Sequence, residues 1–172
     1  MNDLVEYRRT SLEFRRLASN MLRTNYEEGN LHLIRLRTFI QENELIKEII
    51  QRKIANVAYD YKDNFISSEA GWNSFNIPIE DAEHIKAMYD YLIDITKEEE
   101  SLIGRASVFY HSSNKYNDVI RNFIEKAFKP LVDFITDSLS MEIMMFEPEK
   151  RETHIYQNIG NNYPWTLLLF DL

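Results

Sequence analysis

Arg105 and His111 have the residue types and the spacing that could cleave a phosphodiester bond. Five residues separate the guanidinium group of Arg105 from the imidazole of His111. A histidine titrates near neutral pH and can transfer protons, and an arginine can stabilise the negative charge that develops on a phosphate under attack. The two residues are therefore a candidate catalytic pair.

The segment Arg105-Ala-Ser-Val-Phe-Tyr-His111 resembles the Arg-x(4–6)-His signature of HEPN domains. These domains are all-helical bundles of similar size, and many are metal-independent ribonucleases of toxin and defence systems. The resemblance implies that Arg105 and His111 are catalytic and lie near a helix end at a dimer interface. Position 106 is alanine, where the family usually has a polar residue.

Arginines near the N-terminus form a second group of candidate residues. Seven positions, nearly two helical turns, separate successive members of two series, so each series is expected to form a stripe along one side of a helix. The planar guanidinium group can bind phosphate or carboxylate through two hydrogen bonds. The two series are Arg8 with Arg15, and Arg9 with Arg16 and Arg23.

The net charge of −8 is unevenly distributed along the chain. Residues 1–60 contain 10 basic and 9 acidic side chains, whereas residues 61–172 contain 10 and 19. The arginine stripes could pair with acidic helices of the same chain, remain solvated, or contact nucleic acid or an acidic partner. The negative total disfavours general nucleic-acid binding, which depends on neutralising phosphates. The acidic part could instead mimic a polyanion and occupy a basic groove of another protein.

Residue counts exclude several other kinds of catalytic site. The chain has no cysteine, which excludes a thiol nucleophile, an iron–sulfur cluster and a cysteine-type zinc site. Its four glycines are too widely spaced for a phosphate-binding loop, and no Gly-x-Ser-x-Gly elbow occurs. Glu80 and His84 are four residues apart, but no Glu-x-x-His pair is present. We therefore expect neither a metal site nor a cofactor.

The elements that must position these residues are expected to be long helices. Only 4 glycines and 4 prolines occur in 172 residues, too few for the turns of a sheet protein. Apolar residues recur at spacings of three and four, which predicts an all-α bundle of about five helices. Asn43 is expected to cap the third helix, and Pro130 to kink or split the fifth. The expected helices span 2–24, 31–41, 44–61, 79–110 (or two helices with a break near 97–101) and 115–146.

Two segments are expected to lie outside the helices. Residues 62–77 are predicted to form a loop held to the core by aromatic side chains, Trp72 among them. Pro148 is expected to end the helical part, so that a bundle over 1–147 is followed by an irregular tail over 148–172, a polar connector with an apolar end.

The apolar end of the tail is a candidate contact surface. An exposed segment of this kind would be an aggregation hazard, so we expect it to dock on the bundle or on another subunit. Thr166-Leu-Leu-Leu-Phe170 also resembles the Gln-Leu-x-Leu-Phe peptide that docks on bacterial sliding clamps, with threonine in place of glutamine. The residues expected to make the contact are Trp165, Leu167, Leu169 and Phe170.

Three segments, Arg35–Ile50, Trp72–Pro78 and Lys126–Leu139, look similar to an uncharacterised family of helical bacterial proteins. Members of that family resemble accessory or sensor parts of mobile-element and phage-defence systems. The similarity covers roughly residues 5–150, and the family has no established catalytic positions to transfer. The segment His154–Tyr163 resembles the polar connector that often follows such domains, and the short apolar ending departs from it.

The absence of a broader catalytic constellation favours a non-enzymatic protein that acts through contacts with a protein partner or with copies of itself. The N-terminus has no apolar signal core, and no stretch approaches the roughly 20 apolar residues of a membrane span, so we expect a cytoplasmic location and no membrane partner. Two alternatives stay open. One is a HEPN-like ribonuclease that uses Arg105 and His111, and the other is a nucleic-acid-associated factor that uses the arginine stripes.

Overall fold

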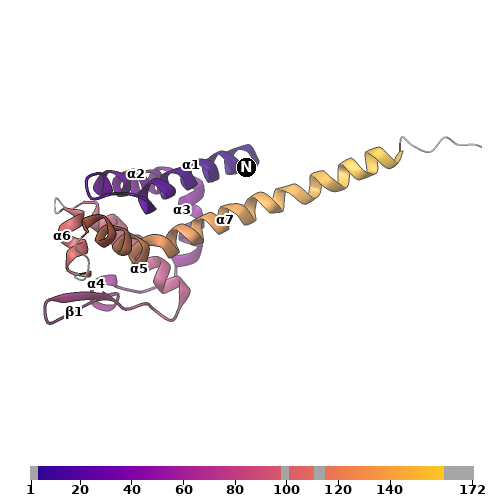
Figure 1. Ribbon diagram of the computed structural model, residues 1–172. Coiled ribbons are helices and arrows are strands. Elements are labelled where there is room, and N and C mark those ends of the chain that lie inside the picture. The colour runs from indigo at the N-terminus through magenta and orange to yellow at the C-terminus, as the bar shows by residue number, and fades with distance from the viewer. Residues whose placement is uncertain (1–3, 98–100, 111–114, 161–172) are drawn as a thin grey trace, which may run out of the picture.

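The computed structural model describes residues 4–97, 101–110 and 115–160, with side chains described as far as Phe146. The described part is mostly helical, as expected, but it is not a purely helical bundle of five long helices. It contains seven helices, two of them short, and a two-stranded sheet (Figure 1). The elements are α1 (Leu4–Leu22), α2 (Gly29–Glu42), α3 (Glu44–Ile54), α4 (Tyr61–Asn64), β1 (Ile66–Glu69), β2 (Trp72–Phe75), α5 (Asp81–Ile95), α6 (Leu102–Ser107) and α7 (Tyr116–Gly160).

Helix α7 is the central element, because α1, α3, α5 and α6 all pack against it. Its apolar residues recur at spacings of three and four and are buried from Val119 to Leu139. The helix is not split at Pro130, which was one of the two effects expected of that residue. Proline removes one intrahelical hydrogen bond, and burial of Leu131 and Ile135 in the next turn stabilises the helical path beyond it.

Helix α1 covers α7 and α2 with one face. The residues on that face are buried and lie three or four positions apart, as in any amphipathic helix. The sequence periodicity identified most of this core face correctly. Its buried members are Tyr7, Thr10, Ser11, Phe14, Leu17, Ala18 and Met21.

Polar side chains set three of the helix boundaries. Asn43 caps α3, because its side-chain oxygen accepts a hydrogen bond from the Ile46 amide at 3.1 Å, which confirms the predicted cap. Ser101 caps α6 through the Gly104 amide at 3.3 Å, so of the two alternatives expected for 79–110 the structure has two helices with a break near 97–101. The helix expected over 44–61 ends at Ile54, and the short α4 then begins after a third cap, Asp60.

The segment expected to be a loop contains a β-hairpin. Ile66 pairs with Phe75 and Glu69 with Trp72 in an antiparallel register. The two turn residues, Ala70 and Gly71, have φ values of 50° and 84°, as a tight two-residue hairpin turn requires. Phe75 anchors the hairpin to the core as expected, whereas the Trp72 side chain is 44% exposed.

The C-terminal part of α7 extends well past the other helices (Figure 1). The expectation that Pro148 ends the helical part is wrong, because the helix continues to Gly160. A proline blocks only the hydrogen bond that its own amide would have made, so a helix can continue beyond it. The predicted contact residues Trp165, Leu167, Leu169 and Phe170 lie outside the described residues.

Candidate functional site

The outward side of α1 combines basic and apolar side chains. A helix turns about 100° per residue, so the residues opposite the buried Phe14 form one continuous strip along the helix. Two members of this strip are aliphatic and strongly exposed, Val5 at 71% and Leu12 at 73%. We call this strip the α1 outer face. It consists of Val5, Arg9, Leu12 and Arg16 of α1 together with Arg23, which directly follows the last helical residue Leu22, and all five are exposed.

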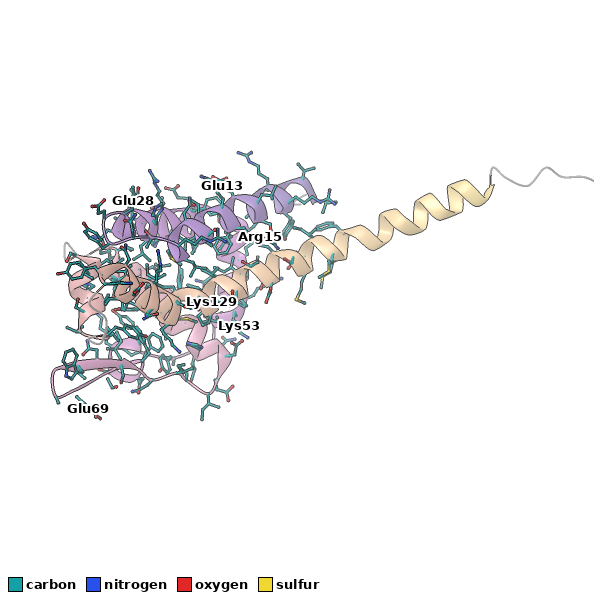
Figure 2. The ribbon with its side chains drawn as sticks, viewed as in Figure 1. Glu13, Arg15, Glu28, Lys53, Glu69 and Lys129 are labelled. Atoms are coloured by element: carbon teal, nitrogen blue, oxygen red, sulfur yellow. The ribbon has the colours of Figure 1, made fainter. Side chains whose placement is uncertain are left out.

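The two arginine series of α1 do not share one side of the helix. Arg15 lies at the edge that faces α7, where its Nη2 donates a hydrogen bond to Oγ of Ser140 at 2.7 Å, whereas Arg8 lines an outward hollow together with Arg9 and Arg16. Figure 2 shows Arg15 between α1 and α7, and Glu13 on the other side of α1. Arg9, Arg16 and Arg23 therefore form the basic part of the outer face, and Arg15 is partly occupied by a contact within the chain.

A shallow hollow of about 520 Å³ lies along the α1 outer face. Three arginines, one glutamate and two aliphatic residues line it, so its described charge is positive. The charged pair within the hollow is Arg16 with Glu13, at 3.8 Å between exposed side chains, and such a pair contributes little free energy. Among the described residues, Arg9 and Arg23 make no ion pair, so no acidic helix within that part of the chain pairs with them.

Arg105 is on α6 and lines a separate hollow of about 370 Å³. Tyr61 and Lys62 of α4 and Tyr91 of α5 are also in its wall. His111 lies outside the described residues, so of the proposed catalytic pair only Arg105 is described. Arg105 itself is half-buried rather than on an open surface.

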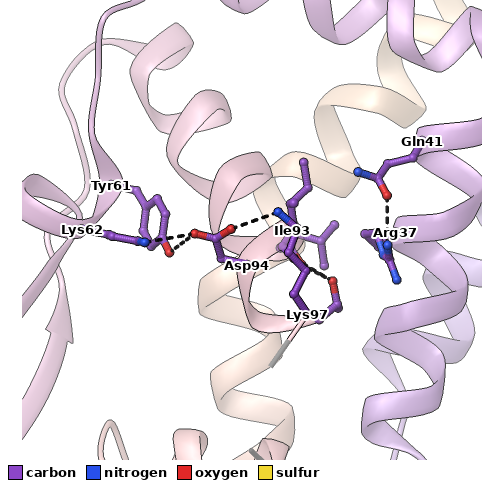
Figure 3. Close-up of polar contacts among 9 residues, drawn as sticks. Arg37, Gln41, Tyr61, Lys62, Ile93, Asp94 and Lys97 are labelled. Carbon is purple, nitrogen blue, oxygen red and sulfur yellow. Dashed lines mark hydrogen bonds and ion pairs between the residues drawn. The ribbon is translucent and has the colours of Figure 1, made fainter. Parts of the chain in front are cut away.

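Asp94 is the centre of a polar network beside this hollow. Its Oδ2 accepts a hydrogen bond from the Tyr61 hydroxyl at 2.8 Å and lies 3.4 Å from Nζ of Lys62. Its Oδ1 lies 3.5 Å from Nζ of Lys97 (Figure 3). These residues border a second, open hollow of about 670 Å³, which also contains Asp60 and Asp90.

The network shifts the pKa values of its acidic and phenolic members in opposite directions. The hydrogen bond from Tyr61, followed by the Lys62 ammonium group, lowers the pKa of Asp94 despite partial burial. Burial and the hydrogen bond to Asp94 raise the pKa of Tyr61. The folded state therefore favours an ionised Asp94 beside a protonated Tyr61, and an aspartate so held by cations is a structural acceptor rather than a general base.

We expect Tyr61→Phe to destabilise the protein by about 1–2 kcal/mol at pH 7, because a hydrogen bond to a charged acceptor is lost. It should also flatten the pH dependence of stability. Asp94 has a depressed pKa when folded, so its contribution is present above its unfolded pKa and is lost as pH falls through the folded value. The raised pKa of Tyr61 means that stability also falls as pH rises past its unfolded value.

Urea unfolding at several pH values between about 2 and 7 would measure how the free energy of unfolding falls as the pH is lowered. Tyr59→Phe is a matched control, because Tyr59 borders the same hollow and its hydroxyl has no hydrogen-bond partner among the described residues. If both variants lose the same stability at pH 7 and show the same loss of stability at low pH, the Tyr61–Asp94 hydrogen bond does not contribute as stated.

Sequence reasoning found the arginines of α1 and Arg105 but missed two features. Val5 and Leu12 could have been identified, because both fall outside the apolar periodicity that Phe14, Leu17 and Met21 define. The bond between Tyr61 and Asp94 joins residues 33 positions apart, and no local pattern indicates it.

The described residues contain no group of three or more histidine, aspartate or glutamate side chains arranged to hold a metal ion. His84, one member of the Glu80/His84 pair, is half-buried with its ring 5.9 Å from that of Phe65. Burial lowers the pKa of His84, an effect that nearby Asp81 opposes. None of the helices in the described part is both long and apolar enough to span a lipid bilayer.

No family model, no curated protein and no solved structure matches this chain.

Proposed function

We propose that this protein acts through protein–protein contacts and that the α1 outer face binds an acidic protein partner. The observation behind the proposal is the exposure of Val5 and Leu12, each above 70%, beside arginines that point away from the core. The two aliphatic residues are seven positions apart and therefore lie on the same side of the helix. We further propose an accessory or regulatory role in the cytoplasm, in mobile-element or defence biology, as the resemblance implies.

The mixed character of the α1 outer face favours a protein over a nucleic acid. Phosphate groups would satisfy Arg9, Arg16 and Arg23 but would leave Val5 and Leu12 in water. A protein with apolar side chains between carboxylates would cover both kinds of group, and burial of apolar side chains commonly supplies the central binding energy of such contacts. Carboxylates around them would orient the partner through charge complementarity.

The net charge of −8 supports the same choice. A nucleic acid would meet long-range repulsion from the acidic remainder of the chain, whereas a folded protein partner presents its negative charge locally. The ribonuclease alternative depends on Arg105 and His111, and the basic stripe of α1 provides no catalytic group for it.

Fluorescence anisotropy with three labelled probes would test this proposal. The probes are a helical peptide with leucines seven positions apart between glutamates, a peptide of the same composition in scrambled order, and a short duplex RNA. We expect the ordered peptide to bind most tightly, and Leu12→Ser to weaken that binding about tenfold, equivalent to about 1.4 kcal/mol. The exposed position of Leu12 means that the fold should tolerate the change.

Tyr116→Ser is the matched control, because Tyr116 is also strongly exposed, at 64%, but lies on α7. Equal binding of the ordered and scrambled peptides, or an unchanged affinity in Leu12→Ser, would contradict the proposed role of the aliphatic residues. Preference for the RNA would favour the nucleic-acid alternative, and RNA cleavage that His111→Ala abolishes would favour the ribonuclease.

A further inference from the structure

The hollow that contains Arg105 lies where five elements meet, and β1 contributes Ile66 to it. Tyr61 and Lys62 come from α4, Asn73 from β2, Tyr91 from α5, and Arg105 from α6. Its volume of about 370 Å³ is within the range of small-molecule sites, which is roughly 300–1,000 Å³. Contacts with the core hold its walls in place.

The hairpin side of the hollow is held by main-chain and ring contacts. The Asn73 amide donates a hydrogen bond to the Val108 carbonyl oxygen at 2.8 Å, which joins β2 to the end of α6. The rings of Phe75 and Phe109 stack with centroids 4.3 Å apart. Fully buried Phe65 packs against Phe75 at 5.1 Å and completes the support. A ligand would therefore meet a largely preformed site, which reduces the entropy lost on binding.

The charge in the hollow favours an anion. Lys62 and Arg105 are the charged residues among the described lining residues, and both are cations, although Nζ of Lys62 also lies 3.4 Å from Oδ2 of Asp94. The Tyr61 hydroxyl is directed to Asp94, which belongs to the neighbouring hollow together with Asp60 and Asp90. The two hollows share Tyr61 and Lys62, so the acidic side chains gather on one side of that wall and Arg105 on the other.

The remaining lining residues favour a planar ring. Tyr91 and Phe109 supply aromatic surface, and Ile66 and Val108 supply aliphatic surface beside it. Aromatic rings pack well against such side chains, and an arginine can bind an anionic group through two parallel hydrogen bonds. We propose that this hollow binds a small organic anion, a single planar ring system that bears a phosphate or a carboxylate, with Arg105 and Lys62 on the anionic group.

Isothermal titration calorimetry on the full chain would test the proposal with two complete probes, adenosine 5′-monophosphate and 4-hydroxybenzoate. Ribose 5-phosphate and adenosine each contain only one half of the first probe. We expect at least one complete probe to bind saturably. If adenosine 5′-monophosphate binds, ribose 5-phosphate and adenosine should each bind at least tenfold more weakly than it does. Preference between the two complete probes distinguishes a phosphate from a carboxylate ligand.

Two variants test whether the probes bind in the hollow that contains Arg105. Arg105→Gln removes the cation and should weaken binding at least tenfold. Val108→Trp should fill the hollow from its 38% exposed position without changing either cation, and should weaken binding to the same extent. Arg121→Gln, an exposed position on α7, is the control and should bind as the unchanged protein does.

Val108→Trp also keeps the test decisive if Arg105→Gln fails to fold. The proposal is overturned if neither complete probe binds at millimolar concentration, or if Val108→Trp binds as well as the unchanged protein. It is also overturned if ribose 5-phosphate binds as tightly as adenosine 5′-monophosphate, because the aromatic wall would then contribute nothing. This site is independent of the α1 outer face, so Leu12→Ser should leave probe binding unchanged.

Discussion

Replacing Phe123 with alanine is expected to lower the free energy of unfolding by about 3–5 kcal/mol, the usual cost of removing a large aromatic side chain from a core. Phe123 lies on α7 and is 0% exposed. Its ring is 5.3 Å from that of Phe109 and 5.9 Å from that of Phe75, so it supports both α6 and the hairpin. The alanine variant would leave a cavity between α7 and these two elements.

A loss of this size is a large fraction of the roughly 5–15 kcal/mol that stabilises most domains. Guanidinium unfolding followed by circular dichroism would measure it. Phe134→Ala is the matched control, because Phe134 is on the same helix but only half-buried at the packed surface. That control should lose about 1–2 kcal/mol, since less apolar area is removed from the core. Equal losses in the two variants would show that the aromatic cluster is not the centre of the fold.

The parts of the fold that the sequence predicted well depend on local physical effects. The cap at Asn43 follows from a side chain that can accept a hydrogen bond two or three residues ahead, and the structure contains that bond. The core face of α1 follows from spacings of three and four residues, and Phe14, Leu17 and Met21 are buried as predicted. Both effects operate within a single helix.

The parts that the sequence did not predict depend on contacts between distant residues. The hairpin β1–β2 has little alternation of apolar and polar residues, and its turn places Ala70 at a positive φ that alanine rarely adopts. Its stability comes from Phe75, whose partners Phe109 and Phe123 are far along the chain. Local rules therefore indicated a loop there.

Pro130 is a second position at which a local rule differs from the structure. A rule about single residues predicts that Pro130 disturbs the helix, and α7 nevertheless continues through it. The cost of one missing hydrogen bond is offset by burial of a long apolar face against α1, α3, α5 and α6. The continuation of α7 through Pro130 thus depends on tertiary packing, which a rule about single residues does not include.

For the candidate sites too, the sequence identified individual residues but not the distant residues that lie beside them. The helical repeat identified the arginines of α1, but only packing shows that Arg15 contacts Ser140 of α7 whereas Arg9 and Arg23 point outward. The Arg-x(4–6)-His motif identified Arg105 but not the residues that share its hollow, such as Lys62 of α4 and Tyr91 of α5. Residue type and spacing can therefore predict which groups have suitable chemistry, and the fold decides which of them share a site.

Reversing two charges of the α1 outer face should have the largest functional effect. We expect Arg9→Glu with Arg16→Glu to weaken binding of the ordered acidic peptide by about 100-fold, because two attractive contacts become repulsive and like charges at an interface cost several kcal/mol. The fold should be retained, since both side chains are exposed and neither supports the core. Anisotropy measures the affinity, and thermal unfolding measures the stability of the variant.

Arg121→Glu with Lys126→Glu is the matched control for this prediction. Both residues are exposed on α7, and the double change alters the net charge by the same amount. If attraction were due only to the overall charge, the two double variants would weaken binding equally, since long-range repulsion does not depend on where the charge lies. A local contact with the α1 outer face predicts instead that the control loses a few-fold at most at 0.15 M salt, where the Debye length is about 8 Å. Equal losses in the two double variants at that ionic strength would therefore remove α1 from the proposed interface.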